Sequence, residues 1–179
     1  MSASENSPVS PMRPNLPAGL LALAFLAGAA AVAYYAQLPP APKPAGAPTA
    51  EFSAERALVH IREVAKANHG AGTRANDAVR RYIFDQLNAL GLDPQIQKAV
   101  NAAGHTGVVE NVLARIPGSG GSKAFAMETH YDSVPYGPGA TDDCGGVGVM
   151  LETARAILAG PRLNNDVILV LSDMEEING

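Results

Sequence analysis

The sequence predicts an α/β domain with a mixed, mainly parallel sheet flanked by helices, preceded by one transmembrane helix. Three observations support this: an uncharged apolar run at residues 18–36, helix-like and strand-like patterns that alternate from residue 52 onward, and a nearly continuous apolar run at 166–172. Alternating helices and strands are typical of α/β domains. A continuous apolar run is typical of a strand covered on both faces of such a sheet.

The N-terminal region is not globular in composition. Residues 1–17 are polar and rich in Ser and Pro, which predicts a disordered tail. As a helix, residues 18–36 would span about 28 Å, close to the hydrocarbon thickness of a bilayer. Tyr34 and Tyr35 lie at one end of this run, where aromatic rings favour the membrane interface. We therefore expect a transmembrane helix at 18–37 in contact with membrane lipid.

Two other interpretations of this run remain open. Ala31-Val32-Ala33 offers a cleavage site for a signal peptide, and a buried core helix is the third possibility. For an anchored protein, Arg13 is the only cation before the helix, so the positive-inside rule favours a cytoplasmic N-terminus. The chain would then be a single-pass membrane protein whose globular part lies on the non-cytoplasmic side.

Residues 38–51 contain five prolines and are predicted to form an extended spacer. The globular part covers 52–179, where Ser53 is a candidate N-cap and Gly91 a candidate left-handed helix end. Apolar periodicity and breaker residues predict helices at about 54–65, 76–90 and 146–159, and strands at 95–100, 111–116, 123–129 and 166–172.

Composition excludes some function classes. The formal net charge is −4 without a basic cluster, so nucleic acid is not an expected partner. Cys144 is the only cysteine, which rules out an internal disulfide. It stands among acids and glycines, so a small packing residue is the expected role.

Acidic side chains and one histidine follow the predicted strands. His130-Tyr131-Asp132 ends one strand, and Asp173 to Glu176 follow another, with Asp142-Asp143 in a glycine-rich loop between them. Ligands of open α/β sheets gather beyond the carboxyl ends of strands, and imidazole with carboxylates suits a divalent metal. Simpler interpretations are a surface His–Asp pair, a helix cap at Asp142 and two solvated glutamates.

At this point the sequence resembles metallopeptidase family 28, the co-catalytic zinc aminopeptidases, and in particular its membrane-bound branch. The resemblance covers about 52–176. It depends on blocks that occur in order: Arg74-Ala75-Asn76-Asp77, Glu110 to Ala114, His130 to Val134, Gly137 to Asp143, Leu151 to Arg155, and Glu175-Glu176. It implies a zinc aminopeptidase-like fold and hydrolysis of peptide bonds in a peptide or protein substrate by metal-activated water.

The resemblance also implies roles for individual residues. His130 would bind one Zn²⁺, Asp142 would bridge two, and Glu176 would bind the second, which gives two Zn²⁺ per complete domain. Asp132 would orient His130, and Glu175 would act as the general base. The Asp142-Asp143 peptide bond would be cis.

One further acid and a late histidine of the family pattern are absent from the sequence. The chain is therefore expected to be the N-terminal part of a peptidase domain, incomplete at its C-terminus and inactive alone, with at most two protein donors per zinc. Two other functions stay open: a glutaminyl-cyclase-like acyltransferase that uses one zinc, and a non-catalytic peptidase-like binding ectodomain.

Overall fold

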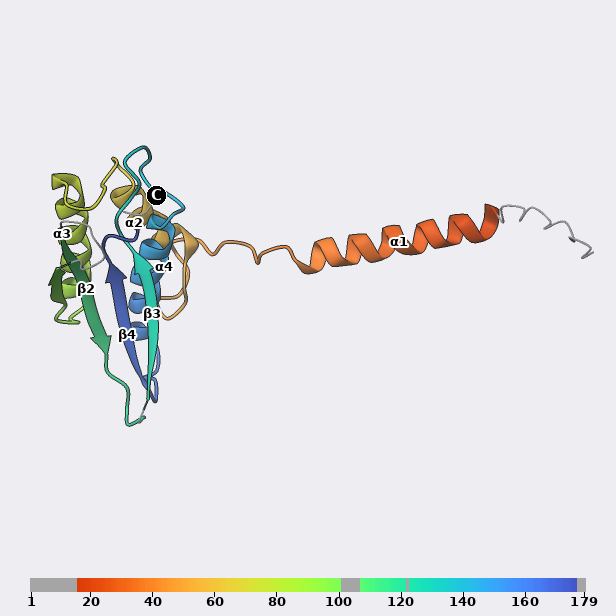
Figure 1. The fold of residues 1–179 in the computed structure, drawn as a ribbon. Coiled ribbons are helices and arrows are strands. Elements are labelled where there is room, and N and C mark those ends of the chain that lie inside the picture. Colours follow the sequence, from red (N-terminus) through yellow and green to blue (C-terminus); the bar gives the residue numbers. More distant parts are fainter. Residues whose placement is uncertain (1–15, 101–106, 122, 177–179) are drawn as a thin grey trace, which may run out of the picture. The chain divides into compact units, whose positions relative to one another are not determined.

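The computed structural model describes residues 16–100, 107–121 and 123–176 (Figure 1). The chain divides into two compact units, Met1–Ala41 and Pro42–Gly179. The described part of the first unit is mainly helix α1 (Leu16–Ala36), with Pro17 in its first turn, where proline is tolerated. The helix is long and apolar enough to cross a membrane, with a mean hydropathy of 2.1. Most of the tail predicted at 1–17 lies outside the described residues.

The second unit contains all seven elements that the sequence predicts. In chain order they are α2 (Ala54–Val64), α3 (Arg74–Ala89), β1 (Gln95–Val100), β2 (Val108–Ile116), β3 (Ala124–His130), α4 (Cys144–Ala159) and β4 (Asp166–Ser172). The oxygen of Ser53 accepts the backbone N–H of Arg56 and caps α2, as predicted. Gly91 follows α3 with a φ of 77°, the left-handed conformation expected there.

The four described strands form one mixed sheet in the order β1-β2-β4-β3. The mixed sheet is confirmed, but β1–β2 and β2–β4 are antiparallel, and only β3–β4 is parallel. Among these strands the sheet is therefore not mainly parallel. The reason is the connections: parallel neighbours need a long crossover, and α4 supplies one only between β3 and β4.

The core lies between one face of this sheet and helices α2, α3 and α4. Alternate residues of β2 and β4 point into it, together with apolar side chains of the helices, including Val112, Ala114, Leu169, Leu171, Ile83, Leu87, Val147 and Leu151. On the other face, Ile168 and Val170 of β4 are only half-buried among the described residues. The prediction that β4 is covered on both faces is therefore not met by this part of the chain.

The segment before α2 is attached to the domain through a group that we call the Glu152 cluster: Glu152, Arg56, Arg155 and the backbone of residues 45–51. Glu152 is fully buried and accepts hydrogen bonds from Arg56 (2.9 Å) and Arg155 (2.6 Å). Both arginines also donate to carbonyl oxygens within 45–51. The sequence predicts an extended spacer at 38–51, and the structure adds that hydrogen bonds from Arg56 and Arg155 hold its second half.

Candidate metal centre

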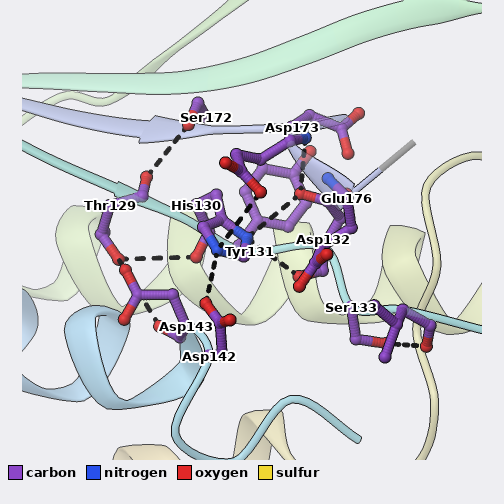
Figure 2. A network of polar contacts seen from close by, with 12 residues as sticks. Thr129, His130, Tyr131, Asp132, Ser133, Asp142, Asp143, Ser172, Asp173 and Glu176 are labelled. Carbon is purple, nitrogen blue, oxygen red and sulfur yellow. Dashed lines mark hydrogen bonds and ion pairs between the residues drawn. The ribbon is translucent and has the colours of Figure 1, made fainter. Parts of the chain in front are cut away.

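The candidate site lies at the carboxyl edge of the parallel pair β3–β4. His130, the last residue of β3, pairs with Ser172, the last residue of β4. The chain leaves both strands at the same edge, so the loop after β3 and the turn after β4 run next to each other (Figure 2). This topology brings together residues that are more than forty positions apart in the sequence.

Three predicted ligands converge at this edge. Donor atoms of His130, Asp142 and Glu176 all lie within 4.8 Å of one another. His130 Nε2 is 3.2 Å from Asp142 Oδ1 and 3.9 Å from Glu175 Oε2. Zinc lies about 2 Å from each nitrogen or oxygen ligand, so the donors of one ion are about 3–4 Å apart. The three donors, all within 4.8 Å of one another, therefore lie close to the spacing that divalent-metal binding requires.

Asp132 connects the two loops of the site. It is buried, and its carbonyl oxygen and Oδ1 lie 3.1 Å and 3.4 Å from His130 Nδ1. Its carboxylate also accepts the backbone N–H groups of Glu175 and Glu176, each at 3.1 Å. Asp132 thus contacts the histidine on one side and fixes the backbone of the paired glutamates on the other. Sequence reasoning identifies only the first contact.

The two adjacent aspartates before α4 have different environments. Asp143 caps α4: its carboxylate accepts the N–H of Gly146 at 2.8 Å and the hydroxyl of Thr129. Asp142 is 81% exposed and lies next to His130. The peptide bond between them is cis, as the family resemblance implies. A side chain at Gly146 would collide with Thr129 and Asp143, so glycine allows this close approach.

The acids of the site lack basic partners. Among the described residues, no Lys or Arg forms an ion pair with Asp132, Asp142, Glu175 or Glu176. Burial raises the pKa of Glu176, and the carboxylate of Asp142 raises it further. Burial opposes protonation of His130, but Asp142, Asp132 and Glu175 together raise its pKa. The surplus negative charge favours a bound cation.

His60, His69 and the cysteine lie outside this centre. His60 contacts Tyr82, and the buried His69 contacts the carbonyl of Ala67. Cys144 is buried, and burial raises the pKa of its thiol to about 11, which fits the predicted packing role. His105 lies outside the described residues.

A pocket of about 370 Å³ adjoins the centre, lined by Asp132, Ser133 and Glu176 on one side and by Asn68, Gly70 and Thr73 on the other. The second wall is the connection between α2 and α3. It is held in place because Ser133 Oγ accepts the N–H of His69 at 2.8 Å. Sequence reasoning missed this wall, since no local pattern links residues 68–73 to β3.

Comparison with known proteins finds similarity to metallopeptidases in part of the chain. Residues 111–178 match the family model described as Peptidase family M28. The vacuolar membrane protease of Candida albicans is 34% identical over 109 residues, 58% of this chain and 13% of the relative. Endoplasmic reticulum metallopeptidase 1 of Mus musculus is 34% identical over 70 residues, 38% of this chain and 8% of the relative. The chain thus spans less than a fifth of the length of either relative.

Two solved structures have the same fold. A glutaminyl cyclase of Porphyromonas gingivalis superposes with a TM-score of 0.63 at 26% identity, over 70% of this chain and 46% of that one. A Zn-dependent exopeptidase from Parabacteroides distasonis gives 0.63 at 22% identity, over 72% and 49%. Residues 111–178, which include the three converging donors and Glu175, therefore carry the pattern of peptidase family M28, and the resemblance inferred from the sequence is confirmed.

Proposed function

We propose that this chain forms the metal-binding edge of a membrane-anchored zinc metallopeptidase, an exopeptidase of the aminopeptidase type that hydrolyses peptide bonds. The observation that carries the proposal is the convergence of His130, Asp142 and Glu176 within 4.8 Å, in a group of acids without a basic partner among the described residues. The match to the family model and the names of the relatives support a peptide or protein as the substrate.

The proposed metal ligands are the three converging donors, and their division between two ions comes from the family resemblance. As the resemblance to peptidase family M28 implies, His130 would hold one zinc and Glu176 a second, and Asp142, which is 81% exposed and lies next to His130, would be shared between them. Asp132 contacts His130 at Nδ1, which would leave Nε2 available to hold a metal. Two zinc ions would then have at most two protein donors each from this chain, below the three typical of a catalytic site.

Zinc, when bound, polarises the scissile carbonyl and a water molecule. Glu175 is proposed as the general base: its carboxylate is 61% exposed and lies 3.9 Å from His130 Nε2, next to the ligands but outside the converging three. It takes a proton from the attacking water and transfers it to the nitrogen of the leaving amine. The carboxylate of Asp132 holds the backbone of Glu175 during both transfers.

A second candidate is a glutaminyl-cyclase-like acyl transfer, which the similarity to the Porphyromonas gingivalis structure favours. The two functions differ in metal content: one zinc for the cyclase and two for the peptidase. Metal analysis of a form that contains the complete domain therefore distinguishes them. Two zinc ions per domain, with release of free amino acids from peptides, support the peptidase.

The metal site itself can be tested in the chain described above. We expect zinc binding measured by titration calorimetry to be weak and to disappear in His130→Ala. Cys144→Ala is the matched control, because Cys144 is buried close to the site but outside the ligand set. We also expect no measurable hydrolysis of aminoacyl chromogenic substrates. Turnover that survives repurification and is abolished by a chelator would contradict this.

The membrane anchor is proposed from α1, whose 21 residues carry no charge and have no buried side chain in the structure. A signal sequence has the same properties, so the test must separate the two. We expect the expressed protein to stay in the membrane pellet after carbonate extraction, with its N-terminus intact. A soluble protein that begins near Tyr34 would instead identify a cleaved signal peptide.

A further inference from the structure

A buried polar cluster lies directly beneath the candidate metal centre and contains none of the proposed ligands. Its central residue is Asp173, the first residue after β4, which is only 7% exposed. Asn76, from the first turn of α3, is 1% exposed and lies beside it. Burial of a carboxylate without a cationic partner costs free energy, so its position needs a reason.

Asp173 makes three hydrogen bonds to neighbouring elements. Its Oδ1 accepts a hydrogen bond from Asn76 Nδ2 at 3.2 Å, and its Oδ2 accepts the backbone N–H of Glu110 at 3.3 Å. Its own backbone N–H donates to Asn111 Oδ1 at 3.0 Å. The point where the chain leaves β4 is therefore tied to both α3 and β2.

The turn that follows has an uncommon conformation. Met174 has a φ of 66°, in the left-handed region that residues other than glycine seldom adopt. Beyond it, the N–H groups of Glu175 and Glu176 are held by the carboxylate of Asp132. The turn is thus fixed by a buried carboxylate at each end, and its conformation decides where the two glutamate side chains point.

We propose that Asp173 is a positioning residue for the paired glutamates: through Asn76 and the backbone of β2 it holds the turn at Met174 that presents Glu175 and Glu176 to the metal. The link to the metal rests on the proposed function. The positioning of the turn does not, because all the contacts involved are within the protein.

The unpaired atom of Asn76 makes this proposal specific. Asn76 Oδ1 is buried and has no hydrogen-bond partner among the residues that the structure describes. If the amide turns over, Oδ1 faces residue 173 and can accept a hydrogen bond. An asparagine at 173 can therefore donate to Asn76 and still accept from the N–H of Glu110, whereas an alanine can do neither. The structure accordingly predicts that Asp173→Asn preserves the turn and Asp173→Ala does not.

The first experiment measures amide hydrogen exchange by NMR in the metal-free full chain. In Asp173→Ala, we expect exchange at Glu175 and Glu176 to rise at least about tenfold relative to the amides of Val167 and Leu169 in β4. In Asp173→Asn, exchange should stay within about threefold of the wild type. Unchanged exchange in Asp173→Ala, or an equal rise throughout β4, would overturn the proposal, as would an Asn variant that behaves like the Ala variant.

Asp166→Ala is the matched control. Asp166 lies at the other end of β4, where it accepts the N–H of Gly118 at 2.7 Å and pairs with Arg115. Its loss should affect that end of the strand and leave exchange at Glu175 and Glu176 unchanged. A rise at the two glutamates in this control would show that any loosening of β4 reaches the turn, and would overturn a specific role for Asp173.

The second experiment measures zinc affinity, because partners behind a metal ligand typically contribute about 10–100-fold. We expect affinity to fall about tenfold in Asp173→Ala and to recover in Asp173→Asn. Altered exchange with unaltered zinc affinity would overturn the link between the turn and the metal. If the wild-type chain binds no zinc, the proposed function fails, and the exchange measurement still decides the positioning role.

Discussion

Two groups of carboxylates in this domain differ in how their charge is neutralised. In the Glu152 cluster, one buried carboxylate accepts hydrogen bonds from two arginines and from the N–H of Ser53. At the edge of β3–β4, four acids lie around His130, and no Lys or Arg of the described chain pairs with them. The first group contains its own counter-charges, and the second leaves room for a cation from outside.

The pKa shifts have opposite directions in the two groups. Burial alone would raise the pKa of Glu152, but Arg155, Ser53 and Arg56 together lower it to about 2. At the metal centre, burial and the neighbouring Asp142 raise the pKa of Glu176. The first group therefore stabilises the fold, whereas the second is unfavourable until a cation binds. This contrast, more than the number of acids, distinguishes the candidate metal centre from a structural ion-pair cluster.

The largest expected effect is a loss of folding stability when the carboxylate of the Glu152 cluster is removed. Glu152→Ala leaves Arg56 and Arg155 without their carboxylate, and removal of one partner from a buried ion pair costs about 3–5 kcal/mol. It should also release residues 45–51, which the same arginines hold. Urea denaturation measures the free energy of unfolding, and limited proteolysis measures release of the segment.

Glu63→Ala is the control for this variant. Glu63 also pairs with a basic residue, Lys66, but both side chains are well exposed, at 43% and 65%. Its loss should cost less than about 1 kcal/mol. Equal costs for the two variants would mean that the Glu152 cluster is not the special anchor described above.

Acid should weaken the same cluster. Glu152 has a folded-state pKa of about 2 against an ordinary value of 4.5, so its contribution is complete above pH 4.5 and lost as the pH falls toward 2. The loss amounts to at most about 3 kcal/mol. Between pH 4.5 and pH 2, the free energy of unfolding should therefore change less steeply with pH in Glu152→Gln than in the wild type. Urea denaturation at a series of pH values measures this. Equal slopes for variant and wild type would contradict the assignment.

At the candidate metal centre, replacing Glu175 should lower kcat, whereas replacing Glu176 should lower zinc occupancy. In a form with the complete domain, Glu175→Gln keeps the size of the side chain but removes its basicity, so kcat should fall by about 100-fold or more at normal zinc content. Glu176→Ala removes a donor, so zinc occupancy itself should fall. Metal analysis alongside kinetics decides this, and the reverse pattern would exchange the two roles.

The helices and strands could be predicted because caps and apolar periodicity are local. Ser53 and Gly91 mark helix ends in the sequence and in the structure. Strand direction could not be predicted in the same way, since a pattern such as 111–116 does not identify its neighbour. The attachment of residues 45–51 could not be predicted for a related reason: proline content predicts an extended segment, but Arg155, which donates to the carbonyl of Thr49, is 106 positions away.

The candidate ligands could be found because His130 and Glu176 follow strand ends and because the motifs around His130, Asp142 and Glu176 resemble those of a known family. The residues that hold them could not. Asp132 contacts the backbone of Glu175 and Glu176 across 43 and 44 positions, and Asn76 contacts Asp173 across 97. Such contacts exist only after β3, β4 and α3 have packed together. Sequence patterns therefore predict the chemistry of this site better than its support.

The smallest expected effect is on the stability of the metal-free chain when one acid of the candidate metal centre is neutralised. Asp142 is exposed and has only His130 as an ion-pair partner among the described residues, beside two further acids. Replacing it with Asn removes one negative charge from a crowded group, so the unfolding free energy of the metal-free chain should change by less than about 0.5 kcal/mol, or rise. Zinc binding, in contrast, should be lost. Denaturation with and without zinc measures both. If Asp142→Asn destabilises the metal-free chain as strongly as Glu152→Ala, the acids at this edge support the fold, and the contrast between the two groups is wrong.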